Sequence, residues 1–98
     1  MQPLVARFSA ELWRWQGDAP WHFVTVPPEV SDDVRDAAGV PTAFGSVRVT
    51  VTVGGITWST SLFPHKESGG YLLPVKKDVR VREDLEVGEP VDVALELA

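Results

Sequence analysis

The clearest pattern in the chain is an alternation of apolar and polar residues over 47–53, followed by Gly54-Gly55 and a second such run over 56–63. Alternation with a period of two predicts strands with one buried face, and two adjacent glycines supply the positive φ angles expected of a two-residue hairpin turn. A slip of one residue would mix the two faces, so the pattern also predicts the register. The predicted pairs are Val53–Ile56, Val51–Trp58, Val49–Thr60 and Val47–Leu62 on one face and Thr52–Thr57, Thr50–Ser59 and Arg48–Ser61 on the other.

Four further segments have the composition or alternation of β-strands. They cover residues 4–12, 21–26, 71–73 and 91–97. The second segment is apolar on both faces, so we expect an interior strand. Trp13 falls on the polar side of the first alternation, as does Trp15, which predicts a bulge or a second covered surface near that strand's end.

One segment has helical spacing, because apolar residues recur at every fourth position from Val30 to Ala38. Pro27-Pro28 is a typical helix start, and Gly39 followed by Pro41 is a typical stop. These features predict a short amphipathic helix over residues 28–38.

The segments between the later strands are less clear. Residues 64–70 have the composition of a polar loop. In segment 75–82, Val75 and Val79 would share one side of a helical turn, whereas Val79 and Val81 alternate with arginines as in a strand. Periodicity leaves both structures open.

The order strand, strand, helix, strand occurs twice if segment 75–82 is helical. Two pairs of residues have the same separation between the halves: Pro27 with Pro74, and Arg35 with Arg82. Half of this chain is too short to bury a core, so we predict one domain over residues 1–98, built from pseudo-repeats at about 1–53 and 56–98. Two packed β-β-α-β halves would close a mainly β barrel without exposed strand edges, and a monomer would suffice.

Composition narrows the class of protein. Hydrophobic residues make up 44% of the chain, which is typical of a globular domain, and there is no cysteine. The absence of cysteine excludes disulfides, thiolate catalysis and cysteine-based zinc sites. The N-terminus has no secretory-signal pattern and no segment approaches the length of a membrane span, so we expect no membrane association and a cytoplasmic location.

Four runs carry a resemblance to a known family: WSTSLFP at 58–64, GYLLPVKKDVR at 70–80, WHFVTVP at 21–27 and VGEPV at 87–91. They resemble the bacterial family called domain of unknown function 1905. The resemblance covers nearly the whole chain. It implies a double-split β-barrel capped at its ends by short helices, and it implies no particular activity.

The C-terminal half has a more distant resemblance, carried by Leu73-Pro74, Val79-Arg80, residues 85–89 and residues 91–93. This half is similar to the swapped-hairpin motif of AbrB-type transition regulators and antitoxins, which dimerise into a DNA-binding barrel. The resemblance implies nucleic-acid binding. The sequence departs from a two-fold basic surface, because the helix of the first half carries several aspartates, which are Asp32, Asp33 and Asp36.

Two groups of residues are candidates for binding. A basic cluster could clamp a phosphate or a nucleic-acid strand, or it could be a solvated helical cap: Lys76, Lys77, Arg80 and Arg82. The net charge of −5 opposes the approach of a polyanion. The polar face of the hairpin and two indoles could bind a small polar or stacking ligand: Arg48, Thr50, Ser59, Ser61, Trp13 and Trp15. The alternatives are a solvated sheet face and packing under a loop.

No catalytic or metal-binding constellation is evident in the sequence. His22 and His65 have no partner at a metal-ligand spacing, and no nucleophile motif surrounds the serines. We therefore predict no metal and no cofactor. The function that fits best is a non-catalytic binding or interaction domain of unknown ligand; the alternatives are a nucleic-acid-binding barrel and an enzyme acting on a small molecule.

Overall fold

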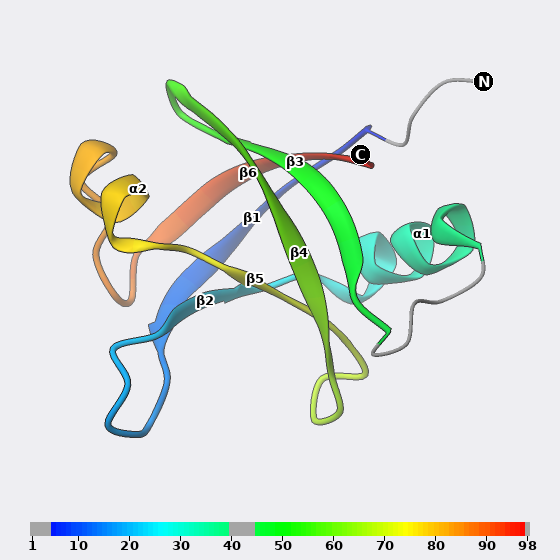
Figure 1. The fold of residues 1–98 in the computed structure, drawn as a ribbon, viewed down its shortest axis with the longest axis horizontal. Helices are drawn as coiled ribbons and strands as arrows, with labels where there is room; N and C mark the ends of the chain where they lie inside the picture. Colours follow the sequence, from blue (N-terminus) through cyan, green and yellow to red (C-terminus); the bar gives the residue numbers. More distant parts are fainter. Residues whose placement is uncertain (1–4, 40–44, 98) are drawn as a thin grey trace.

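The computed structural model describes residues 5–39 and 45–97; Leu4 and Pro41, which enter the predictions above, lie outside these ranges. Six strands form a closed antiparallel barrel in the order β1-β2-β5-β4-β3-β6, and two short helices lie on opposite sides of it (Figure 1). The elements are β1 (Val5–Arg14), β2 (His22–Thr25), α1 (Pro28–Ala38), β3 (Val47–Val53), β4 (Ile56–His65), β5 (Gly70–Pro74), α2 (Lys77–Arg82) and β6 (Pro90–Leu97).

The predicted hairpin is confirmed with its register, because all seven expected pairs of β3 and β4 are present, from Val53 opposite Ile56 to Val47 opposite Leu62. The prediction for the turn was partly wrong. Only Gly54 has a positive φ, of 57°, and Gly55 does not. A positive φ at the first central position alone is the pattern of a type II′ turn, which matches the twist of the strands as well as a type I′ turn does.

The helix predicted over residues 28–38 is confirmed as α1, which ends at Gly39 with a φ of 72°. Segment 75–82, which periodicity left open, contains the helix α2. Val75 and Val79 are both buried in the core, whereas Val81 is 68% exposed, which is the helical spacing of the two patterns. The loop predicted over residues 64–70 is shorter in the structure. Pro64 still pairs with Tyr71, and only residues 66–69 connect the two strands.

The barrel interior is filled by the inward-facing side chains of the strands, which lie opposite one another on neighbouring strands. Leu12 lies opposite Val24, and Val24 lies opposite Leu73, so three neighbouring strands contribute one continuous apolar row. All three side chains are fully buried. Val34 of α1 and Val79 of α2 join the same core. Burial of this row follows from strand alternation, since every second residue must face inward when a sheet closes on itself.

A second apolar cluster covers the outer face of β1 and β2. Trp13 pairs with Phe23 across the two strands, and their ring centroids are 5.3 Å apart. The Trp15 ring lies edge-on to the same phenyl ring, with the two centroids 6.4 Å apart. The alternation continues to Arg14 without a bulge, so the bulge was the wrong prediction. The second covered surface is present in part, because Trp13 is half-buried whereas Trp15 is 45% exposed. Phe23 is consequently buried although it points away from the barrel interior.

Candidate functional site

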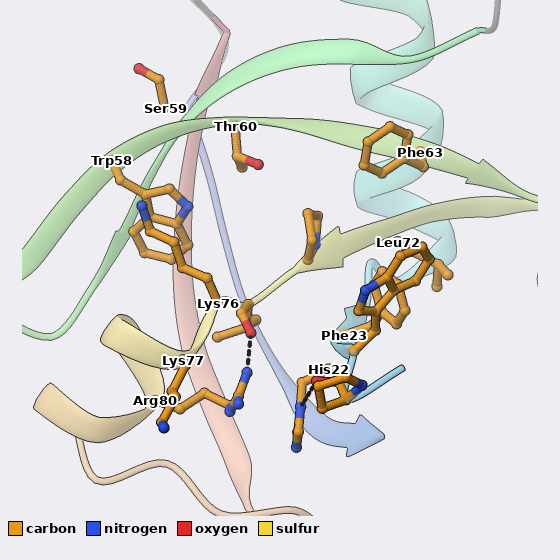
Figure 2. A pocket seen from close by; sticks show the side chains of 14 residues that line it. His22, Phe23, Trp58, Ser59, Thr60, Phe63, Leu72, Lys76, Lys77 and Arg80 are labelled. Carbon is orange, nitrogen blue, oxygen red and sulfur yellow. Dashed lines mark hydrogen bonds between the residues drawn. The ribbon is translucent and has the colours of Figure 1, made fainter. Parts of the chain in front are cut away.

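A pocket opens where β4 and β5 diverge. The two strands pair only at one end, from Phe63 opposite Leu72 to His65 opposite Gly70. The first part of β4 pairs with β3, and the last residue of β5, Pro74, pairs with β2. The separation leaves a hollow of about 990 Å³, which is lined by both strands, by Pro20–Phe23 and by the start of α2 (Figure 2).

The floor and one wall of the pocket are apolar. Phe23 and Leu72 form buried parts of the lining, whereas Trp21 is 60% exposed and Phe63 is 47% exposed. Phe63 lies on the outer face of β4 because its neighbour Leu62 points into the barrel. Figure 2 shows Phe63 above Leu72 and Phe23, with open space between this group and Trp58. A flat apolar molecule would find aromatic surface on both sides.

The opposite rim is basic. Lys76, Lys77 and Arg80 line the pocket at the start of α2, and Figure 2 shows Lys76 running beside Trp58. Arg80 is held in place, because its Nη1 donates a hydrogen bond of 2.7 Å to the carbonyl oxygen of Val75. Within residues 5–39 and 45–97, none of these three cations forms an ion pair. Their charge is therefore available to a ligand.

The four basic residues predicted as one cluster do not all line the same pocket. Arg82 does not line the large pocket but a second, smaller hollow of about 210 Å³, which adjoins the pocket because Trp58 and Lys76 line both. Successive residues of a helix point in different directions, so Arg80 and Arg82 face different surfaces of α2. The large pocket thus brings together three of the four predicted cations, while Lys76 also borders the small hollow that Arg82 lines.

The hydroxyl face of the hairpin lies outside the large pocket for the most part. Arg48 donates from Nη1 to the Oγ atom of Ser61 at 3.4 Å, and Thr50 pairs with Ser59 on the same outer face. Ser59 touches the rim of the pocket, but Figure 2 shows its hydroxyl pointing away while Thr60 points inward. This face has the geometry of an ordinary solvated sheet surface.

Trp13 and Trp15 also lie away from the pocket lining. The Trp13 indole nitrogen donates to the Oγ1 atom of Thr25 at 2.9 Å, and the Trp15 ring packs on Phe23. The two indoles pack on one side of Phe23. The Trp21 ring, which lines the pocket, lies edge-on to the Phe23 ring, and the two ring centroids are 6.4 Å apart. Their placement is that of supporting residues behind one wall of the pocket.

A ring nitrogen of each histidine lies within hydrogen-bond distance of a nearby oxygen atom. A distance of 3.0 Å separates the Nδ1 atom of His22 from the carbonyl oxygen of Pro20, and 2.9 Å separates Nδ1 of His65 from the hydroxyl of Ser68. In the part of the chain that the structure describes, no three histidine, aspartate or glutamate side chains come together in a way that could hold a metal ion. The pocket is lined mainly by aromatic, aliphatic and basic groups, and its other polar residues are His22, Ser59 and Thr60.

Sequence reasoning missed the aromatic residues that define the pocket, Trp21 and Phe63. A signal for each was present. Phe63 follows Ser59 and Ser61 on the polar face of the hairpin, where a phenyl ring interrupts the alternation. Residues 21–26 are apolar on both faces, so one face had to be covered by something outside the barrel.

The fold and the site together define a class of protein: a small, closed β-barrel with a lateral apolar pocket that is rimmed by cations. Of the helices in the described ranges, neither α1 nor α2 has the length and apolar character needed to cross a bilayer. The chain belongs to the family described as Domain of unknown function (DUF1905), whose model matches residues 8–95. No curated protein matches the chain.

Proposed function

We propose that this protein is a non-catalytic binding domain, and that the pocket between β4 and β5 holds a small ligand with a large apolar surface. The observation that carries the proposal is the exposure of Trp21 and Phe63 over a floor formed by Phe23 and Leu72. Exposed aromatic surface gathered in a hollow marks binding sites, and ligand pockets are mostly apolar with volumes of roughly 300–1,000 Å³. The hollow of about 990 Å³ is at the upper end of that range.

The chemistry of the lining supports binding without turnover. General-base catalysis needs a base within hydrogen-bond reach of the group it activates. His22 is the one imidazole that lines the pocket, and its Nδ1 atom lies against the Pro20 carbonyl oxygen. Among the described residues that line the pocket, no carboxylate is present to orient this ring or to act as an acid. A turnover assay whose activity mapped to one pocket side chain would contradict this part of the proposal and favour an enzyme acting on a small molecule.

Binding can be tested with phenylnaphthylamine, a neutral aromatic probe whose fluorescence rises in apolar surroundings. We expect saturable binding to the wild-type protein. We expect Phe63→Ser to weaken it by about tenfold, because the substitution removes most of one aromatic wall. Trp21→Ser is expected to act in the same direction. Both side chains are largely exposed, so both variants should fold normally, as circular dichroism would verify.

The matched control is Val87→Ser, since Val87 is 55% exposed and lies away from the pocket lining. It should leave the affinity for the probe within about twofold of the wild type. Equal losses in all three variants, or no saturable binding at all, would contradict the proposed function.

A nucleic-acid-binding barrel is the second candidate, because the structure gathers Lys76, Lys77 and Arg80 on the rim of a pocket that the exposed Trp21 also lines, and an indole could stack on a base. The net charge of −5 and the exposed aspartates of α1, Asp32, Asp33 and Asp36, oppose it. A gel shift that weakens with salt and with the double variant Lys76→Ala/Lys77→Ala would favour this candidate. No shift at low salt would remove it.

We also propose a finer description of the architecture, a double-split barrel of two pseudo-repeated β-β-α-β halves in a cytoplasmic protein. The pairings support it. If β1, β2 and β3 correspond to β4, β5 and β6, then each strand pair of the barrel has a counterpart: β1–β2 with β4–β5, and β1–β6 with β4–β3. In both halves the first strand is shared between two neighbours along its length.

A further inference from the structure

The lysine and arginine side chains that line the pocket gather on one rim and carry a single sign of charge; the other polar residues of the lining are His22, Ser59 and Thr60. Lys76, Lys77 and Arg80 all border the hollow, and its described lining contains no acidic side chain. In the view of Figure 2 these cations lie on the side away from Phe63. A ligand that spans the pocket would therefore meet the apolar surface of Phe63 and Leu72 at one end and positive charge beside Trp58 at the other.

Arg80 is the best oriented of the three cations. Its side chain is partly buried, and its hydrogen bond to the Val75 carbonyl at 2.7 Å fixes the guanidinium at the mouth of the pocket. A guanidinium carries five N–H donors, so one such bond leaves others for a ligand. A carboxylate suits this geometry because it can accept two parallel N–H bonds. A donor that is already held in place loses less side-chain entropy when the ligand binds.

The net charge of −5 does not oppose a small anion in the way that it opposes a polyanion. Charges separated by more than about 8–10 Å are largely screened at physiological ionic strength. A nucleic acid would extend over the acidic remainder of the surface, including α1. A small molecule would sense mainly Lys76, Lys77 and Arg80, none of which is neutralised by an ion pair in the described structure.

From these observations we infer that the ligand is a small organic carboxylate with a flat apolar body, the ring system lying between Trp21 and Phe63 and the acid group meeting Arg80 and Lys76. The inference rests on the proposed function, because it assigns a chemical class to the ligand of the same pocket. Apolar contact area would supply affinity for the body of the ligand. The cations would orient it and select acids over neutral compounds of the same shape.

The test compares naphthoate with naphthamide, two compounds of the same ring system and nearly the same shape, of which only the first is an anion. Binding is followed by calorimetry at low and at high salt. We expect the wild-type protein to bind naphthoate at least about tenfold more tightly than naphthamide at low salt, as one charge-assisted hydrogen bond would give. We expect high salt to narrow the difference.

Three charge-neutralising variants locate the effect. Arg80→Gln and Lys76→Gln should each weaken naphthoate binding by about tenfold or less and leave naphthamide binding unchanged. Arg82→Gln is the matched control, since it removes the same charge from the same helix at a side chain that lines only the small adjoining hollow. Because Arg80 also bonds to a backbone carbonyl, the exposed Lys76 provides the variant that should not disturb folding.

The outcomes separate the inference from the proposed function. Equal affinities for the two compounds, or an equal loss of naphthoate binding in Arg82→Gln and Lys76→Gln, would overturn the carboxylate inference and leave a neutral apolar ligand for the same pocket. Loss of all binding of both compounds to the wild-type protein, together with no binding of phenylnaphthylamine, would overturn both.

Discussion

Ser31 joins three segments of the chain through one buried hydroxyl group. The side chain is 1% exposed. Its Oγ atom donates to the carbonyl oxygen of Val26 at 3.3 Å and accepts a hydrogen bond from the backbone N–H of Tyr71 at 3.3 Å. The helix α1 is thereby tied to the end of β2 and to β5. Gly70 allows this approach, because a β-carbon there would lie 2.5 Å from the same hydroxyl oxygen.

We expect Ser31→Ala to lower the free energy of unfolding by about 1–3 kcal/mol, because it leaves the buried N–H of Tyr71 without an acceptor. Urea denaturation measures the change. Ser9→Ala is the matched control, since Ser9 is exposed on β1, and it should alter stability by less than about 0.5 kcal/mol. Equal effects of the two substitutions would show that the hydroxyl of Ser31 contributes no more than a surface serine.

At the scale of elements, the hairpin and α2 are connected at the β3–β4 turn. The backbone N–H of Gly55 donates to a carboxylate oxygen of Glu83 at 3.3 Å, and Glu83 is the residue that ends α2. Gly54 has a φ of 57°, and a β-carbon at this position would collide with the same carboxylate. The turn therefore needs a glycine for its backbone conformation and for its contact with the helix.

Gly54→Ala is expected to destabilise the protein by about 1–3 kcal/mol, because alanine is strained at a positive φ. Gly55→Ala is the control, since its added methyl group would meet Glu83 at an ordinary contact distance of 3.8 Å. Thermal denaturation of both variants measures the difference. Adding Glu83→Ala to Gly54→Ala should recover the part of the loss that comes from the collision. No greater loss in Gly54→Ala than in Gly55→Ala would contradict this account.

At the scale of the whole molecule, closure of the barrel gives every described strand a neighbour on each side. β1 lies between β6 and β2, and β3 lies between β4 and β6, so no described strand stands at the outer edge of an open sheet. Only where the pocket opens is part of β4, from Ile56 to Leu62, paired on one side alone. An unpaired edge would recruit another chain through its N–H and C=O groups. Among the described strands, all pairings are made within one chain.

We therefore expect a monomer of 10.7 kDa in sedimentation experiments at low protein concentration. The exposed Trp21 and Phe63 are the side chains that would favour self-association as concentration rises, so Phe63→Ser should reduce any dimerisation that is seen. A dimer that persists on dilution and is unaffected by Phe63→Ser would contradict a self-sufficient barrel.

The local periodicity of the sequence determined the hairpin, its register and α1. Alternation and adjacent glycines constrain neighbours in the chain, and the paired residues of a hairpin are close in sequence. For α2 the sequence was ambiguous, because valines at 75, 79 and 81 satisfy both periods. Burial of Val79 against the core, a long-range contact, decided the structure.

The site was only partly determined by the sequence, which identified its cations but not its aromatic wall. Lys76, Lys77 and Arg80 are neighbours in the chain, so composition alone gathered them. The tertiary structure decided that they face Trp21 and Phe63, which belong to β-strand regions distant in sequence. That arrangement arises because β4 leaves β5 after a few pairs while both strands remain bound to other neighbours. The point of divergence depends on closure of the whole barrel, which no local pattern encodes.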